Sequence, residues 1–491
     1  MMDEYGMNEC VINEYRMNEH MADRLSQRSE APFESILKKI NRVMFAGTNS
    51  GCGKTTITCG IMQALLDQGL RVSSFKCGPD YIDPMFHSKV IGTKSSNLDS
   101  FFTNEDTLKE LLCDNSADTD ITIMEGVMGY YDGIGLTDEG SAYSISTKTD
   151  TPVILIIDAK GMSTSIGAVI EGFLHYREVS NIKGVIFNRL APTLYDRVKK
   201  MVEDIGIKAY GYLPAKKDLS IESRHLGLVT ADELTDIKDK IKILGAMTSE
   251  TIDIEGIIAL SESAKELNIQ EERVVSKNPF VKIGIAKDKA FCFYYSENLR
   301  LLERLGAELV YFSPLESKEL PENLNGLYLG GGYPELYSKE LSSNKKLLNQ
   351  IKISIQAGMP TIAECGGFMY LHEELEDKYG QVHKMAGVIP GKSFRTERLK
   401  YFGYIKMSAR EDSLLAKKGE VIKAHEFHYW DSENKGTAFH IEKAAGDKEW
   451  DGIHVTSSFY GGYPHLYFYS NPLIAERFID KCSEYSMSKV R

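Results

Sequence analysis

The sequence predicts two α/β domains in one chain, and three observations lead to this prediction. From Asn41 onward, short runs rich in Val and Ile alternate with amphipathic helical patterns, which is typical of a mostly parallel sheet covered on both faces. The alternation stops in a polar stretch around residues 252–278 and starts again at Val281. Each half also has a glycine-rich turn between an apolar strand and a helix, around Lys54 in the first half and Cys365 in the second.

The composition fits a globular chain of this kind and excludes several other classes. The 491 residues carry 58 Lys and Arg against 70 Asp and Glu, a net charge of −12, and at about 150 residues per domain the length suggests two to four domains. With 42% hydrophobic and 26% charged residues, the chain is neither collagen-like, nor disordered, nor a disulfide scaffold. A pI near 5.5 argues against nucleic-acid binding through a basic field. It leaves an anionic small molecule open as a ligand.

Cysteine spacing and hydropathy indicate a cytoplasmic protein that does not enter a membrane. The eight cysteines form no CxxC pair, so neither a zinc ribbon nor a disulfide framework is expected. The longest purely aliphatic run, Val153–Ile157, is far shorter than the roughly 20 residues of a membrane helix. The N-terminus is polar and acidic, unlike a signal peptide.

The first domain is expected to span residues 39–250, after a polar N-terminal tail of residues 1–38. The tail contains a short duplication and no sustained apolar periodicity, which favours a mobile segment over a docking element. Apolar runs predict strands at 42–46, 71–75, 121–124, 153–157, 185–187 and 209–213. Helical patterns between them cover 56–66, 166–176 and 194–205.

The second domain is expected to span residues 280–491. Residues 251–279 are polar and helix-forming, and we expect them to link the two domains. The second α/β rhythm predicts strands at 281–286, 309–312, 326–329 and 360–363 and helices at 298–305 and 345–357.

A phosphate-binding loop is predicted where the first strand of the first domain meets its first helix. The segment ends in Gly-Lys-Thr, and its small residues let successive backbone N–H groups approach phosphate oxygens. The helix N-terminus adds partial positive charge, Lys54 neutralises the β and γ oxygens, and the Thr55 hydroxyl can reach Mg²⁺. We therefore expect ATP and Mg²⁺ to bind at Gly47, Thr48, Asn49, Ser50, Gly51, Cys52, Gly53, Lys54, Thr55 and Thr56.

The length and sequence of this loop indicate which group of nucleotide-binding proteins it resembles. Counted from Gly47, it is one residue longer than GxxxxGK[ST], and in this it resembles the loop of dethiobiotin-synthetase-like ligases. Partitioning ATPases of the MinD type carry an extra lysine just after the first glycine, where this chain has Thr48. The sequence therefore lacks the residue that would support a dimeric nucleotide switch.

Acidic side chains follow two later strands of the first domain. Asp80 and Asp83 lie just after one strand, close to Lys76, and Glu125 follows another. Because ligands bind at the carboxyl ends of strands in open α/β sheets, these carboxylates are candidates for holding Mg²⁺ or orienting an acceptor. Both aspartates adjoin a proline, so a pure turn role is an equal alternative for them. A solvated strand end is the alternative for Glu125.

A cysteine in the second domain has the setting of a nucleophile. Cys365 stands between an apolar strand and a helical pattern and precedes two glycines, as the sharp turn of a nucleophile elbow requires. A helix N-terminus would lower the thiol pKa from its free value of about 8.5. Backbone N–H groups able to stabilise an oxyanion are expected at Gly330, Gly331, Gly332 and Gly366.

The base that serves this cysteine would be a histidine distant in sequence. His465 is our choice because it follows a Gly-rich segment late in the domain. From chemistry alone, His425, His428 and His454 compete with it. His425 and His428 also have metal-ligand spacing, but without a nearby third ligand a metal site there is disfavoured.

The motifs together resemble one family. Residues 41 to about 480 are similar to the CobB/CbiA group of cobyrinic acid a,c-diamide synthases, in which an ATP-dependent synthetase domain is fused to a class I glutamine amidotransferase domain. The matching stretches, in order, are GTNSGCGKTT, FKCGPDYIDP, LDSFF, EGVMGYYDG, GGGYPE, AECGGFMYL, HEFHY and YPHLYF. Cobyric acid synthases look similar in architecture but usually carry a Gln-Asn-Met type segment in place of Gly-Pro-Asp-Tyr-Ile-Asp.

The resemblance implies a fold and a set of site residues. It implies a dethiobiotin-synthetase-like P-loop domain with a parallel sheet, followed by a flavodoxin-like α/β amidotransferase domain. In the wider amidotransferase class a Glu commonly stands two residues after the histidine, where this chain has Tyr467, so a Cys–His pair is expected. The implied residues are Cys365 and His465 for glutaminase chemistry, Lys76, Asp80, Tyr81 and Asp83 for the acceptor, and Thr55, Asp80, Asp83 and Glu125 for Mg²⁺.

The activity implied by the resemblance is amidation of the a and c carboxylates of a corrinoid acid with ATP and glutamine. A carboxylate resists attack until phosphoryl transfer from ATP makes it an acyl phosphate, which ammonia from glutamine captures. Ni-sirohydrochlorin is the alternative acceptor, and a nucleotide-switch protein with a relic amidotransferase domain is the non-enzyme alternative. A polyanionic acceptor needs local cations. Lys76, Arg395 and Lys400 are candidates, with ordinary surface charge as the alternative.

Overall fold

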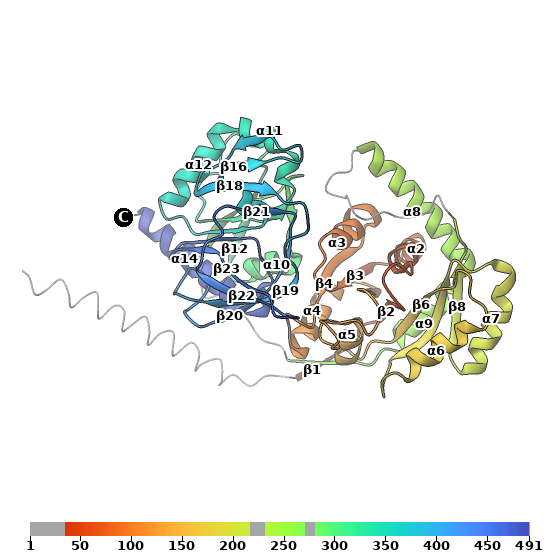
Figure 1. The fold of residues 1–491 in the computed structure, drawn as a ribbon. Coiled ribbons are helices and arrows are strands. Elements are labelled where there is room, and N and C mark those ends of the chain that lie inside the picture. Colours follow the sequence, from red (N-terminus) through yellow and green to blue (C-terminus); the bar gives the residue numbers. More distant parts are fainter. Residues whose placement is uncertain (1–34, 217–230, 271–279, 491) are drawn as a thin grey trace, which may run out of the picture.

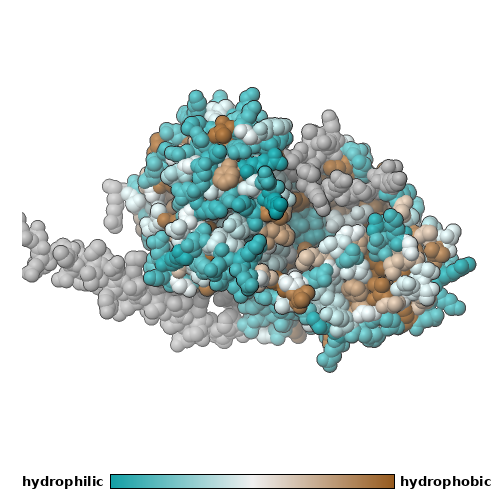
Figure 2. Space-filling model, viewed as in Figure 1, coloured by the Kyte–Doolittle hydropathy of each residue, from teal (hydrophilic) through white to brown (hydrophobic). Residues whose placement is uncertain are grey.

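A computed structural model describes residues 35–216, 231–270 and 280–490. The described chain forms two α/β units that face each other (Figure 1). The surface in the view of Figure 2 is largely hydrophilic, with scattered apolar patches, some of them where the two units meet. No helix among the described residues is both long and apolar enough to cross a membrane.

The first unit is built on a seven-stranded sheet in which all the pairings are parallel, with the strand order β4-β3-β5-β2-β6-β7-β8. Each of the six strands predicted from apolar runs is present. The seventh, β4, was not predicted because its sequence, Lys-Ser-Ser-Asn-Leu, is mostly polar. The strands are β2 (Arg42–Gly47), β3 (Val72–Cys77), β4 (Lys94–Leu98), β5 (Ile121–Gly126), β6 (Val153–Asp158), β7 (Ile182–Asn188) and β8 (Lys208–Leu213).

Helices cover both faces of this sheet, as Figure 1 shows. In β2, Val43 and Phe45 belong to one apolar cluster, while Met44 and Ala46 belong to another, because successive strand residues point to opposite faces. The first cluster contains α2 (Lys54–Asp67), α8 (Ala231–Thr251) and α9 (Ile254–Glu262). The second contains α4 (Glu105–Ser116), α5 (Ala142–Lys148), α6 (Ser165–His175) and α7 (Pro192–Ile205).

A two-stranded sheet joins the segments on either side of the first unit. Strand β1 (Ser35–Lys38) pairs antiparallel with β9 (Leu267–Gln270). Strand β1 lies in the segment expected to be a tail, and β9 lies in the segment expected to be a helical linker without a strong strand. Residues 1–34 of the expected tail and 271–279 of the expected linker lie outside the described residues.

The second unit has a six-stranded sheet in the order β12-β10-β13-β15-β25-β24, parallel except at β24. The predicted strands and helices of this unit are all present. The sheet consists of β10 (Val281–Ala286), β12 (Ala307–Phe312), β13 (Gly326–Leu329), β15 (Thr361–Glu364), β24 (His454–Val455) and β25 (Phe459–Gly462). Its helices are α10 (Ser296–Arg304), α11 (Ser338–Ser343), α12 (Lys345–Gln356), α13 (Gly366–Tyr370) and α14 (Leu473–Val490).

The sequence had not predicted two mainly antiparallel sheets formed by residues 372–466, nor a short pair of strands at residues 291–293 and 331–332. One sheet has the order β17-β16-β18-β21 and another β23-β22-β19-β20-β26, while β11 (Phe291–Phe293) pairs with β14 (Gly331–Gly332). The strands are β16 (His372–Glu376), β17 (Val382–Lys384), β18 (Ile389–Arg395), β19 (Phe402–Ala409), β20 (Val421–Phe427), β21 (Trp430–Ser432), β22 (Phe439–Lys443), β23 (Glu449–Gly452) and β26 (His465–Leu466).

Candidate active sites

The predicted phosphate loop has a backbone that only glycine can adopt at its end. Gly53, just before α2, has φ +98°, and a Cβ built there would lie 2.0 Å from Nδ2 of Asn188. The same Nδ2 donates to the carbonyl of Cys52 at 2.9 Å. Positive φ and close approach both require glycine. The turn therefore presents the N-terminus of α2 at the carboxyl edge of β2, where an anion is stabilised.

Lys54 connects the loop to the segment that follows β5. Its ammonium group donates to the carbonyl of Asn49 at 3.0 Å and to the carbonyl of Met128. Burial lowers the pKa of Lys54, and the nearby Lys76 acts in the same direction. The side chain is therefore folded back over the loop, in the place where it can meet phosphate oxygens.

A buried polar network lies beside the loop, at the carboxyl ends of β3 and β5. Oε1 of Glu125 accepts from the Thr55 hydroxyl at 2.6 Å and from the Lys76 ammonium at 2.8 Å. Lys76 also pairs with Asp83 at 2.6 Å, and Nε2 of His87 lies 3.5 Å from Oε2 of Glu125. Burial opposes ionisation of Glu125, yet Lys76 and His87 hold its pKa below the usual range.

The acids predicted to bind Mg²⁺ do not all have the same environment. Thr55 and Glu125 offer oxygens to one point beside the loop, and Oε2 of Glu125 is buried without a hydrogen-bond partner, so these two fit a hard cation. Asp83 is paired with Lys76. Asp80 accepts the N–H groups of Ile82 and Asp83 through its side chain, which is the turn role considered as an alternative. Burial, with Asp83 nearby, raises the pKa of Asp80 to about 6.

Cys365 occupies a strained turn between β15 and α13. Its φ of 47° and ψ of −103° lie outside the regions that ordinary residues adopt. A Cβ on Gly366 would lie 3.0 Å from the backbone N of Gly332, and one on Gly367 would lie 2.1 Å from the carbonyl oxygen of Leu329. The two glycines after the cysteine are therefore required by close packing, as expected for a nucleophile elbow.

The expectation of a low thiol pKa is wrong for this structure. Burial raises the pKa of the Cys365 thiol, and the nearby Glu335 raises it further. The hydrogen bond from the N–H of Gly366 lowers this pKa, but it does not outweigh the other two effects. Burial also raises the pKa of Glu335 to about 8. Helix α13 has only five residues, so its dipole is weak. The thiol is therefore protonated at neutral pH and needs a base.

His465 lies next to strand β14 (Gly331–Gly332), called the glycine strand below, and next to the elbow at Cys365. A Cβ on Gly331 would lie 2.4 Å from Cε1 of His465, and Gly332 contacts Gly366 as described above. The N–H of Gly330 donates to the Tyr294 hydroxyl at 2.8 Å. The N–H of Gly330 is therefore already used in a hydrogen bond and does not point to an oxyanion. Stabilising the oxyanion stays a prediction for the N–H groups of Gly331, Gly332 and Gly366.

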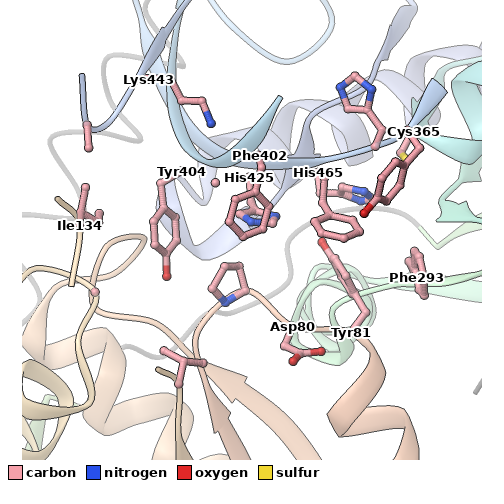
Figure 3. Close-up of a pocket in the computed structure, with 18 of the residues that line it drawn as sticks. Asp80, Tyr81, Ile134, Phe293, Cys365, Phe402, Tyr404, His425, Lys443 and His465 are labelled. Carbon is pink, nitrogen blue, oxygen red and sulfur yellow. The ribbon is translucent and has the colours of Figure 1, made fainter. Parts of the chain in front are cut away.

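One cavity of about 900 Å³ lies between the two units and is lined by residues of the predicted acceptor and glutaminase sites. Cys365 and His465 line it on one side, and Asp80 and Tyr81 line it on the other (Figure 3). Met128 of the first unit also lines it. The ring of Tyr81 packs against His465 in a tilted arrangement, with centroids 5.0 Å apart. The Met128 carbonyl also accepts from Lys54, so the phosphate loop contacts one residue of the cavity wall.

Known proteins share both units of this chain. Residues 43–229 match the CobQ/CobB/MinD/ParA nucleotide-binding domain, and residues 282–473 match the CobB/CobQ-like glutamine amidotransferase domain. A cobyrinate a,c-diamide synthase of Thermoplasma volcanium is 40% identical over 92% of this chain and 99% of its own length. One of Caldanaerobacter subterraneus subsp. tengcongensis is 39% identical over 90% of this chain and 98% of its own length.

The chain belongs to the cobyrinate a,c-diamide synthase family. The predicted fold class of a P-loop unit joined to an amidotransferase unit is thereby confirmed, and the chain is a glutamine-dependent amidoligase.

In this member of the family the other histidines have different environments from that of His465. Ring nitrogens of His428 contact the carbonyl of Trp430 and, at 3.4 Å, Glu426. His454 contacts the carbonyl of Asn434 at 3.0 Å. His425 lines the cavity, and burial lowers its pKa to about 3. No group of three metal-binding side chains among the described residues includes His425 or His428.

A carboxylate that sequence reasoning missed lies beside His465. Oε2 of Glu364 is 3.8 Å from Nδ1 of His465, and the same carboxylate accepts from the Tyr328 hydroxyl at 3.2 Å and from the Leu466 N–H at 3.3 Å. Tyr467, the residue at the place of the usual glutamate, is fully buried among aromatic rings. The signal in the sequence was the position of Glu364 directly before the nucleophile.

Proposed function

We propose that this protein converts the a and c carboxylates of cobyrinic acid to amides, with ATP and glutamine as co-substrates. The observation that carries the proposal is the cavity between the units, which Cys365 and His465 line on one side and Met128, whose carbonyl accepts from Lys54, lines on the other. The names of the relatives at about 40% identity support the acceptor.

The amidotransferase unit releases ammonia. The Cys365 sulfur attacks the side-chain carbonyl carbon of glutamine while its proton passes to His465. The tetrahedral oxyanion lies near the N–H groups of the elbow and of the glycine strand, which stabilise it. His465 returns the proton to the leaving nitrogen, so ammonia departs and a thioester remains. Water activated by the same histidine cleaves the thioester to glutamate and the free thiol.

The synthetase unit activates the acceptor. An acceptor carboxylate oxygen attacks the γ-phosphorus of ATP, ADP leaves, and an acyl phosphate forms. Lys54 neutralises charge on the transferred group, and Thr55 with Glu125 would hold Mg²⁺, which supplies further neutralisation of phosphate charge. Ammonia from the amidotransferase side of the cavity then attacks the acyl carbon and phosphate departs. Two such cycles give the diamide.

A product assay tests the proposal. Purified protein is incubated with ATP, Mg²⁺ and glutamine and either cobyrinic acid or Ni-sirohydrochlorin, and the products are weighed by mass spectrometry. We expect two carboxyl-to-amide conversions of cobyrinic acid, dependent on both ATP and glutamine. Exclusive amidation of Ni-sirohydrochlorin would replace the acceptor while keeping the mechanism. Amidation of neither acceptor would contradict the proposed function.

A further inference from the structure

The cavity has a second, unassigned wall on the amidotransferase side, away from Cys365. It is formed by the β19–β20 pair and by the end of β22, which carry Phe402, Phe427 and Lys443. At about 900 Å³ the cavity is near the upper end of the roughly 300–1,000 Å³ typical of ligand sites. Glutamine alone would leave most of this space empty.

The wall presents aromatic rings to the open space. Phe402 and Phe427 are opposite each other on the two strands, with ring centroids 5.5 Å apart. They are 56% and 45% exposed although both are large and apolar. Tyr429 continues the row 6.0 Å beyond Phe427 and is also exposed. Apolar side chains that gather in an exposed recess mark a ligand or partner surface, and flat rings favour a flat ligand face.

A cation lies beside these rings without a counter-ion. Lys443 ends β22 and points into the cavity (Figure 3), and within the described part of the chain its ammonium forms no ion pair or hydrogen bond. Burial lowers its pKa, and Lys448 across the turn adds to this, whereas Glu426 opposes it. Asp447 on the same turn also lines the cavity. A half-buried ammonium that lacks a partner favours a carboxylate ligand.

A buried histidine provides an independent sign of a missing ligand. His425 on β20 is only 5% exposed, lines the same cavity, and its Nδ1 has no hydrogen-bond partner. Such orphan groups are rare in native structures because they cost about 1–3 kcal/mol each. The three cations named from the sequence do not serve this wall. Lys76 pairs with Asp83 and Glu125, Lys400 pairs with Asp431, and Arg395 donates to the carbonyl of Lys378.

We propose that the amidotransferase unit supplies half of the acceptor site, with Phe402 and Phe427 against the face of a macrocycle and Lys443 bound to one of its peripheral carboxylates. The proposal rests on the proposed function for the identity of the ligand, a flat ring with several carboxylates. It places the acceptor across both units, so that the carboxylate to be amidated reaches the Asp80–Tyr81 side while another is held by Lys443. Because the acceptor must contact both units at once, the site selects ligands by the size of the macrocycle as well as by its charge.

Equilibrium binding tests this proposal separately from turnover. Cobyrinic acid is titrated calorimetrically into wild-type protein and into Lys443→Gln, Lys443→Arg and Phe402→Ala variants. We expect Lys443→Gln to weaken binding about tenfold or more, Lys443→Arg to retain most of it, and Phe402→Ala to weaken it severalfold. Added salt should weaken binding by wild type more than by Lys443→Gln.

Matched controls come from the same sheet and from outside the cavity. Lys406→Gln on β19 removes an exposed lysine that does not line the cavity, and Tyr311→Ala on β12 removes an exposed aromatic ring elsewhere; both should bind as wild type. Thermal unfolding verifies that every variant is folded. Equal affinities of Lys443→Gln and wild type, or no binding of cobyrinic acid to wild type, would overturn the inference. Binding that depends on Lys443 without amidation would instead contradict the proposed function alone.

Discussion

Cys365 combines a strained backbone with a thiol that burial keeps protonated. Replacing it with alanine removes the nucleophile and leaves the synthetase unit untouched. We expect Cys365→Ala to abolish amidation driven by glutamine, whereas high concentrations of ammonium salt still support it. The measurement is product formation with each nitrogen source. Loss of both activities in a folded variant would show that the two sites are not separate.

Glu364 is the residue whose position best explains how His465 is oriented. Its carboxylate is 3.8 Å from Nδ1 of the imidazole and is fixed by Tyr328. We expect Glu364→Gln to lower kcat of glutamine hydrolysis at least tenfold, with little change in KM for glutamine, because acid–base catalysis needs a correctly held imidazole.

A role limited to packing would give a different result for Glu364. Activity with ammonia should be unchanged in Glu364→Gln, which shows that the fold is intact. The control is Glu374→Gln on β16, where an exposed carboxylate pairs with Lys384. A parallel change of kcat and KM in Glu364→Gln, or no change in kcat, would exclude the positioning role.

The sequence was informative about residues whose chemistry depends on local backbone. The phosphate loop and the cysteine elbow were recognisable because each needs glycine at fixed offsets, at Gly53 and Gly366. Contacts made by distant segments were not recognisable. Glu364 and His465 are 101 positions apart in the sequence, and their pairing follows from strand order. The same is true of Lys76, whose two buried ion pairs could not be read from its place after a strand.

At the scale of elements, the junction of β2 and α2 can be tested through its glycines. Gly53 has φ +98° and no room for a Cβ, whereas Gly69, just beyond α2, has φ +84° and open space around it. We expect Gly69→Ala to cost about 1–2 kcal/mol of stability through φ alone, with normal kinetics. Gly53→Ala should cost more and also weaken ATP binding, because the loop must move away from Asn188.

Two measurements separate these effects. Thermal unfolding compares the stability of the two variants, and nucleotide titration compares their affinity for ATP. The prediction would be contradicted if Gly53→Ala bound ATP as tightly as Gly69→Ala does.

Elements with continuous apolar runs were predicted, and elements with mixed burial were not. Strands β2, β5 and β6 are buried on both faces and read as runs of Val, Ile, Leu and Met, as parallel strands do. The antiparallel strands of residues 372–466 alternate buried and exposed positions, as in β19. In strand β4, Ser96 and Asn97 are buried where the two units contact each other, and Arg300 of the second unit donates to the Ser96 hydroxyl. Polar residues buried by a partner unit carry no local signal.

At the scale of the whole molecule, polar contacts hold the units together. Glu297 accepts the N–H of Asn97 at 2.9 Å, and the Tyr404 hydroxyl donates to Asp99 at 2.7 Å. Burial raises the pKa of Asp99 to about 7 despite that hydrogen bond. In the unfolded chain the value is about 3.9. The folded state therefore binds this proton more tightly, and the associated stability is present below about pH 4 and lost as pH rises through about 7.

Asp99→Asn removes this titration while keeping the size and polarity of the side chain. We expect the variant to become progressively more stable relative to wild type as the pH is raised from about 5 to about 8. Other groups titrate equally in both proteins and cancel in the comparison. Unfolding midpoints measured across this range provide the test, and a difference between the two proteins that stays constant with pH would contradict it.

Tyr81 belongs to the synthetase unit, but its ring packs in a tilted arrangement against His465 of the amidotransferase unit. The centroid of its ring lies 5.0 Å from that of the imidazole and 5.3 Å from that of Phe293, while Asp80 beside it lines the cavity between the units. We expect Tyr81→Ala to hydrolyse glutamine without matching amidation, so that the ratio of amide formed to glutamate released falls below that of wild type. Tyr81→Phe retains the ring and should keep the wild-type ratio. Both products are quantified in one reaction, and an unchanged ratio in Tyr81→Ala would mean that the contact between Tyr81 and His465 carries no coupling between the sites.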